Sequence, residues 1–518
     1  MKIQTIVSSL LVSIILVSCM PAGIVVPTET TIPASTITPI PPTPTITPTS
    51  APENIADSKD LPIWVDEFVH AYGGKVTVNG IEMDASQLTD EIRKNGEKYT
   101  ERKQVNGNEI LFLVINGIPL AMREGNSQWQ EATMAKLGEF NGVEFESSLR
   151  LDGRKYQEFS RISERALGSN PIIVLTTNLD VTEVFGDFTV SDWQSILNNW
   201  DDIQKDFSSG IVPAGYPYYW KSGQEGMDAD VIRAFGGSPQ YRSQQLYEGG
   251  LRDDGDRIQA LKVFQSQKSQ EEMLKIFEFV VRSRVLQFPQ IERWDVSDEI
   301  SAAYVQYIYN QVNEKNFWGL ATGLKPSELT IKVAEWVKQD NPEAKTYITE
   351  SNIFDMANPV AADELDYFYN VYIPEIIKGN TNHQIDGVIG ENNWWIYEPQ
   401  DWSQIAAKID YLNDNGLKIG GSETMIVSGD TPINDCCGRR KLIEIQDPKQ
   451  AQAEMFSQWV DLYLDKGIRT IGFGNIDDFY AWTQDVGLPD ANPTIFDIDF
   501  RAKPAYYSIV KTLYEHIP

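Results

Sequence analysis

Histidine and cysteine are scarce in this chain, which contains three of each among its 518 residues. His70, His383 and His516 lie far apart, and no spacing of these residue types resembles a zinc or di-iron motif. Basic residues are also few, because 44 Lys and Arg stand against 74 Asp and Glu, which gives a net charge of −30. A surface of this charge repels nucleic acid and anionic membrane faces. We therefore expect no metal site, no nucleic-acid partner, and a neutral ligand rather than a polyanion.

An apolar run near the N-terminus, Ile6 to Leu16, is short for a membrane span and follows the positive residue Lys2, as in a signal peptide. It ends in Leu16-Val17-Ser18-Cys19, which resembles a bacterial lipoprotein signal, where the cysteine is lipidated and becomes the mature N-terminus. The alternative is a plain secretory signal that happens to contain a cysteine. The resemblance implies an extracytoplasmic protein that is anchored to the bacterial cell envelope through a lipid on Cys19.

Composition divides the rest of the chain. Between Pro21 and Pro52 the residues are mostly Thr, Pro, Ser and Ile with almost no charge, which predicts a disordered, extended tether rather than a packed core. A small α+β module should follow, with a strand and Asn-Gly turn at 75–81, a helix at 84–94, and another strand and turn at 110–117. The predicted parts are a signal peptide, a Thr/Pro-rich linker, the module and a barrel, at residues 1–19, 20–58, 59–125 and 126–518.

Short apolar strand candidates alternate with helical stretches from about residue 126 onward, a pattern that predicts a (β/α)8 TIM-type barrel of the α/β class. Eight strands are predicted to begin near Val143, Ile172, Ile211, Ile291, Thr346, Ile385, Lys418 and Thr470. Helices are predicted between most of them, for example at 271–283, 330–340, 402–415 and 451–466. The stretch 222–290 should form a large loop region after the third strand. In such barrels the active site lies at the C-terminal ends of the strands.

Two of the predicted strands end in a glutamate. Glu299 closes the segment 294–299 after the fourth strand, and Glu423 lies in the segment 417–424 of the seventh strand. A pair of carboxylates from different strands is what glycoside hydrolysis requires, one as proton donor and one as nucleophile. The other interpretation is that each glutamate merely ends a strand and faces water.

Five segments resemble motifs of glycoside hydrolase family 10, the xylanase family. They are its acid/base motif Trp-Asp-Val-Val-Asn-Glu, a further strand motif, its nucleophile strand, its strand-eight segment and its C-terminal motif, at residues 294–299, 344–352, 416–423, 473–482 and 496–507. The resemblance implies a (β/α)8 barrel and a retaining, endo-1,4-β-xylanase-like glycosidase without cofactor or metal. Glu299 would be the acid/base and Glu423 the nucleophile, with carboxyl groups about 5 to 5.5 Å apart.

Several positions depart from the family pattern. Tyr216, Lys221, Asn393 and Gly420 stand where the family carries histidines, and Asp298, Glu391 and Gly474 replace an Asn, a Gln and a Trp. The resemblance places these positions at sugar subsites, so we expect plain xylan to be a poor substrate. The predicted sugar-contacting residues are Tyr216, Trp220, Lys221, Asp298, Asn352, Glu391, Asn393, Trp394 and Trp482. Core packing is the alternative for each tryptophan, and a capping or loop role is the alternative for the polar residues.

Two hypotheses for the function follow. The first is a surface-anchored retaining glycoside hydrolase, expected to be a monomer, that cleaves a β-linked polysaccharide. The second is a non-catalytic glycan-binding protein on a degenerate barrel of the same family. The adjacent Cys436 and Cys437 lie between Asp435 and Gly438 in a predicted turn, where a vicinal disulfide and two free thiols are both possible.

Overall fold

The described part of the chain covers most of the residues after the N-terminal region. The computed structural model describes residues 54–148, 156–169, 172–175, 190–216, 240–245, 263–289, 291–299, 317–357, 362–421, 423–429, 442–485, 488 and 490–518. Cys19, the tether, Trp220, Lys221, Cys436 and Cys437 therefore lie outside the described residues. None of the described helices is long and apolar enough to cross a membrane.

The first described region is an α+β module. Its helices and 3₁₀ turns are η1 (Ile55–Asp57), α1 (Leu61–Ala71), α2 (Ala85–Asn95) and η2 (Gly96–Tyr99), and its strands are β1 (Val76–Val78), β2 (Ile81–Met83), β3 (Thr100–Val105), β4 (Asn108–Ile115), β5 (Ile118–Glu124) and β6 (Gln130–Glu131). Strands β1 and β2 form one hairpin, and β3 to β6 form an antiparallel sheet. Asn79 and Gly80 both have positive φ, as a two-residue hairpin turn requires, so the Asn-Gly signal predicted this turn correctly.

Eight parallel strand positions form the barrel. In chain order the strands are β7 (Glu144–Ser148), β8 (Ile172–Leu175), β9 (Gln240–Gln245), β10 (Arg293–Asp298), β11 (Lys345–Ser351), β12 (Gly387–Glu391) with its continuation β13 (Asn393–Trp395), β14 (Lys418–Ile419) with its continuation β15 (Met425–Val427), and β16 (Thr470–Phe473). The sheet runs in the order β14-β12-β11-β10-β9-β8-β7-β16. A parallel bridge between Thr424 and Phe473 joins its two edge strands and closes the barrel.

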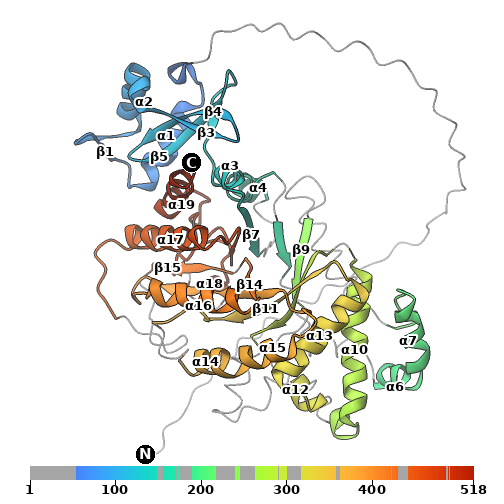
Figure 1. The fold of residues 1–518 in the computed structure, drawn as a ribbon. Coiled ribbons are helices and arrows are strands. Elements are labelled where there is room, and N and C mark those ends of the chain that lie inside the picture. The colour runs from blue at the N-terminus through green and yellow to red at the C-terminus, as the bar shows by residue number, and fades with distance from the viewer. Residues whose placement is uncertain are drawn as a thin grey trace, which may run out of the picture. The chain divides into compact units, whose positions relative to one another are not determined.

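Helices alternate with these strands along the chain (Figure 1). They are α3 (Met134–Asn141), α4 (Tyr156–Leu167), α6 (Val190–Asn198), α7 (Trp200–Ser208), α10 (Gln270–Gln287), α12 (Phe317–Thr322), α13 (Pro326–Asp340), α14 (Ala362–Tyr367), the π-helical turn η3 (Phe368–Tyr372), α15 (Ile373–Gly379), α16 (Trp402–Asp414), α17 (Pro448–Asp465), α18 (Trp482–Asp485) and α19 (Pro504–Glu515). Helix α10 begins at a capping box in which Ser269 and Glu272 exchange hydrogen bonds. Sequence and structure therefore agree on a (β/α)8 barrel that follows an α+β region.

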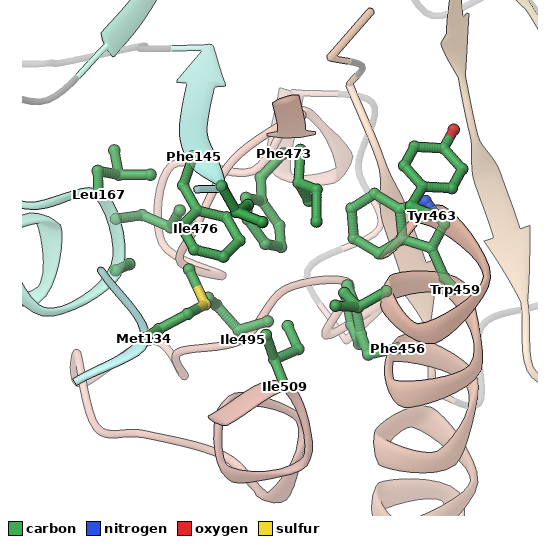
Figure 2. Packing of buried hydrophobic residues seen from close by; sticks show 14 of the residues in the cluster. Met134, Phe145, Leu167, Phe456, Trp459, Tyr463, Phe473, Ile476, Ile495 and Ile509 are labelled. Carbon is green, nitrogen blue, oxygen red and sulfur yellow. The ribbon is translucent and has the colours of Figure 1, made fainter. Parts of the chain in front are cut away.

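Aromatic side chains fill the layer between the strands and the surrounding helices. The Phe473 ring of β16 lies 6.3 Å from that of Phe145 on β7 and 5.6 Å from that of Trp459 on α17, measured between ring centroids. Figure 2 shows this packing, with Phe456 and Tyr463 of α17 beside Trp459. All five side chains are buried, so the contact holds α17 against the strands where the barrel closes.

The third strand differs from the prediction. Residues 211–216 form no strand, and the third barrel strand is β9, which pairs with β8 on one side and β10 on the other. The predicted strand near Ile211 is therefore wrong, and the stretch 222–290 contains β9 and all of α10 rather than a loop region that follows strand three. The sequence of β9, Gln-Tyr-Arg-Ser-Gln-Gln, has almost no apolar residues, so an apolar pattern could not reveal it.

Candidate active site

Parallel pairing brings the C-terminal ends of β10, β11 and β12 to one rim of the barrel. Asp298 pairs with Thr349, and Ser351 pairs with Glu391. Glu299 follows Asp298 directly, and its backbone N–H donates to the Thr349 carbonyl oxygen at 3.1 Å. Glu299 and Glu391 thus belong to the same rim, two strands apart. This is the end of a (β/α)8 barrel where active sites lie.

The backbone of Glu299 is strained. Its φ of +47° lies in the left-handed region, which costs a residue other than glycine on the order of 1 to 3 kcal/mol and persists only where the surroundings enforce it. The hydrogen bond from Glu299 N–H to Thr349 extends the β10–β11 pairing by one residue past the strand end. The strained backbone points the Glu299 side chain in a direction that a regular strand would not give it.

Glu423 lies in the seventh strand between its two segments, β14 and β15. The pairing of Asn393 with Met425 fixes the register with the sixth strand, and the Met425 N–H donates to the Asn392 carbonyl oxygen at 2.9 Å. Glu391 precedes Asn393 by two residues, as Glu423 precedes Met425. Between the pairs Val388–Ile419 and Asn393–Met425 the seventh strand carries one residue more than the sixth, so Glu391 lies beside the segment that holds Glu423. Neighbouring strands lie about 4.8 Å apart in a sheet.

Electrostatics link three glutamates of the rim, Glu299, Glu391 and Glu423, which we call the rim glutamates. Glu391 is 8% exposed, whereas Glu299 and Glu423 are partly exposed. Burial raises the pKa of the Glu391 carboxyl well above its ordinary value, and the negative charges of Glu423 and then Glu299 raise it further. Both charges act on Glu391, so the structure gathers the three carboxyl groups in one site.

Inside the barrel a second buried glutamate has a different partner. Glu146 of β7 accepts two hydrogen bonds from the Arg293 guanidinium, at 2.8 and 2.9 Å, and both side chains are buried or nearly so. We call Glu146 and Arg293 the interior pair. A Cβ at Gly421 would lie 1.9 Å from the Glu146 Oε1 atom and 2.8 Å from the Thr470 methyl group, so a larger residue at position 421 would force one of these groups to shift.

The structure brings some of the predicted sugar-contacting residues to this rim. Asp298 and Glu391 end strands β10 and β12, and Asn393 begins β13. Asn352 follows β11 with φ +57°, and its N–H donates to the Glu391 carbonyl oxygen at 2.9 Å. The Asn393 Oδ1 atom is buried and accepts no hydrogen bond from the described residues.

Trp394 is not a sugar-stacking residue, and this prediction is wrong. Its side chain is fully buried and packs edge-to-face on Trp402 of α16, at 5.4 Å, and on Trp459 of α17, at 6.4 Å. Successive side chains of a strand point to opposite faces, so Trp394 points to the helical layer and Asn393 points to the opposite face of the strand. Core packing, the alternative interpretation, is correct for this tryptophan.

Tyr216 also lies away from its predicted place at the end of strand three. Its ring packs edge-to-face on Phe279 of α10, with centroids 5.0 Å apart, and α10 packs against α12 and α13 in the helical layer. The prediction that Tyr216 ends a barrel strand is therefore wrong, because the third strand is β9. Trp482 begins α18 just after β16, and its side chain lies outside the described part of the structure.

Two further carboxylates, which were not among the predicted site residues, affect the pKa of Glu391. Glu350 of β11 and Asp295 of β10 are each 1% exposed, and both raise the pKa of Glu391, less than Glu423 and Glu299 do. Both residues lie within segments that resemble family motifs. Their acidic character inside buried strands was the available signal, because a buried strand seldom carries an isolated charge.

Among the described residues, one group has the spacing of metal ligands. Asp461, Asp465 and His516 hold ligand atoms within 4.8 Å of one another. The two aspartates are exposed on α17, and His516 Nε2 already lies 2.8 Å from Asp461 Oδ1. The rim glutamates lie on the barrel strands instead, so this group is not part of the candidate active site.

Comparisons with known proteins agree with this geometry. Residues 259–512 match the model of glycosyl hydrolase family 10. Xylanase 10B from Thermotoga maritima has the same fold, at a TM-score of 0.50 and 15% sequence identity over 74% of this chain and 99% of that one. Xylanase 10B from Thermotoga petrophila RKU-1, solved with xylobiose, gives a TM-score of 0.50 and 16% identity over 76% and 100%. No curated protein sequence matches the chain. Through residues 259–512, this chain belongs to glycosyl hydrolase family 10.

Proposed function

We propose that this protein is a retaining glycoside hydrolase that cleaves a β-linked polysaccharide, as an endo-β-1,4-glycanase of the xylanase type. The observation that carries the proposal is the joint action of Glu299 and Glu423 on the buried Glu391 at the C-terminal rim of the barrel. Two carboxyl groups from strands four and seven are then available to one sugar ring. Membership of a glycosyl hydrolase family supports the same reaction.

Each glutamate has a separate role in this mechanism. Glu423 attacks the anomeric carbon as a carboxylate and forms a glycosyl-enzyme, while Glu299 protonates the leaving glycosidic oxygen. Glu299 then takes a proton from water, which releases the sugar with its configuration retained. The strained backbone of Glu299 fixes the direction of the acid before substrate arrives, which lowers the cost of orienting it.

The substrate differs from plain xylan in this proposal. Asn393 and Gly420 stand where the family carries histidines, and an ionised Asp298 in place of Asn can only accept hydrogen bonds. An acceptor at this position suits the hydroxyl groups of a neutral sugar. A net charge of −30 also disfavours polyanionic glycans.

The location follows from the N-terminal sequence. A lipid on Cys19, followed by the Thr/Pro-rich tether, would hold a monomeric barrel outside the cell at the envelope surface. Mass spectrometry of the mature N-terminus should then find an acylated Cys19. An unmodified mature chain that starts elsewhere would remove the anchor from this proposal.

A glycan-binding barrel without turnover is the second candidate. The observation that favours it is the replacement of sugar-contacting positions, most clearly at Asn393, Gly420 and Gly474. Such a protein would bind polysaccharide and release no product.

Reducing-sugar release from a panel of β-linked polysaccharides separates the two candidates. The purified protein should release product from at least one member and little from plain xylan. Glu299→Ala should retain activity on aryl glycosides with activated leaving groups, and added azide should accelerate it by attacking the glycosyl-enzyme in place of water. Binding without release across the whole panel would favour the second candidate.

A further inference from the structure

We propose that Glu391 is a positioning residue that keeps a proton at neutral pH and donates a hydrogen bond to the Glu423 carboxylate. The inference rests on the proposed function, because it gives Glu391 a part in the reaction that Glu423 performs. It gives Glu391 a role other than the direct sugar contact that the sequence predicts.

The pairing of the sixth and seventh strands brings Glu391 close to Glu423. Glu391 lies beside the seventh-strand segment between Ile419 and Met425, which carries one residue more than the sixth strand does between Val388 and Asn393. The side-chain amide of Asn392 donates to Thr424 Oγ1 at 3.1 Å, which ties the two strands together between these pairs. Glu391 and Glu423 directly precede the two partners of this hydrogen bond, so their side chains start on neighbouring strands about 4.8 Å apart and can reach each other.

The surroundings of Glu391 favour its neutral form. It is 8% exposed, and the charged groups that act on it most strongly are all carboxylates. They come from three strands and their ends, namely Glu423 in the seventh strand, Asp295 on β10 with Glu299 directly after it, and Glu350 on β11. The Arg293 guanidinium is bound to Glu146, and its Nε lies 3.7 Å from Asp295 Oδ1. A buried carboxyl group among four acids avoids both desolvation and repulsion by staying neutral.

Only the neutral form of a carboxyl group can donate a hydrogen bond. A protonated glutamate carries one O–H donor, whereas an ionised one only accepts. Next to Glu423 this proton allows a hydrogen bond where two carboxylates would repel each other. The neutral acid also resembles an amide in shape and in having a donor.

Substitutions at position 391 test the role in the reaction. Glu391→Ala removes the donor and should lower kcat on the order of 100-fold, as the loss of a preorganised donor does. Glu391→Gln restores a donor of the same size and should return kcat to within about threefold of the native value near pH 5. A Gln variant as inactive as the Ala variant, or one whose loss is entirely in KM, would overturn the proposal in favour of an ionised hydroxyl acceptor.

The pH dependence of thermal unfolding tests the proton without using activity. A carboxyl group whose pKa is raised in the folded state stabilises the protein fully below its unfolded pKa, and this effect is lost as the pH rises toward the folded value. Gln cannot ionise, so the Tm of Glu391→Gln should exceed the native Tm by about 3 °C or more at pH 8, with no gap near pH 4.

The exposed Glu139→Gln is the matched control, and its Tm should follow the native curve at every pH. A constant gap for Glu391→Gln between pH 4 and 8 would show that Glu391 does not hold the proton. If the native protein cleaves no substrate, the proposed function fails, while this comparison of Tm values still decides the protonation of Glu391.

Discussion

Glu146 and Glu391 are both buried glutamates on strands of one barrel, but their neighbours differ. Glu146 forms two hydrogen bonds with Arg293 and packs closely on Gly421, where an added Cβ would collide with its carboxyl group. Glu391 ends its strand beside Glu423 and Glu299, and burial together with their charges raises its pKa. In the interior pair the opposite charges of Glu146 and Arg293 neutralise each other, whereas the rim glutamates are three acidic groups close to one another.

The difference indicates what each group of residues contributes. A paired buried charge holds strands together, and losing one partner leaves the other uncompensated. A cluster of like charges costs stability, and such clusters with perturbed pKa values are typical of sites that perform chemistry. The seventh strand contacts both groups, through Gly421 and Glu423, so substitutions a few residues apart on it should affect different properties.

The largest expected effect is on the reaction at the rim. Glu423→Gln keeps the size of the side chain but removes the nucleophile, so kcat should fall on the order of 10⁴-fold or more. The Tm should not decrease, since one of several like charges is removed. Steady-state kinetics and thermal unfolding of the same preparation check both points. Normal turnover by Glu423→Gln would show that the reaction does not depend on this carboxylate.

The next effect is on stability at the interior pair. Arg293→Met leaves Glu146 buried without its bidentate partner and should lower the free energy of unfolding by about 3 to 5 kcal/mol. Urea unfolding measures the loss. Arg102→Met is the control, because its ion pair with Glu109 is exposed and should contribute less than about 1 kcal/mol. Equal losses in the two variants would mean that burial does not distinguish these pairs.

A smaller effect is expected at the glycine between the two groups. Gly421→Ala places a Cβ against Glu146 Oε1 and the Thr470 methyl group, and should destabilise the protein by about 1 to 3 kcal/mol. At Gly420 the nearest contacts of an added Cβ are 3.0 Å, so Gly420→Ala should cost less. Urea unfolding of both variants gives the comparison, and the reverse order would show that Glu146 can move aside.

The sequence predicted the parts of the barrel in which apolar strands alternate with amphipathic helices. The segments around Glu299 and Glu423 were recognisable because each is an apolar strand that ends in an acid. Strand β9 was missed, since its polar residues are held by backbone pairing with β8 and β10 rather than marked by an apolar pattern. Trp394 was misassigned because the sequence shows two adjacent tryptophans but not which one faces the helices.

The place where the barrel closes has a consequence for how the protein loses activity on heating. Among the described residues, the seventh and eighth strands are joined by the backbone of Thr424, whose N–H donates to Gly472 at 3.1 Å and whose carbonyl oxygen accepts from Gly474 at 3.2 Å. Glu423 is the neighbouring residue, so the proposed nucleophile lies at the seam of the barrel. Local opening of the pairing between the seventh and eighth strands would displace the proposed nucleophile while most of the fold persists. Loss of activity on heating should therefore precede global unfolding.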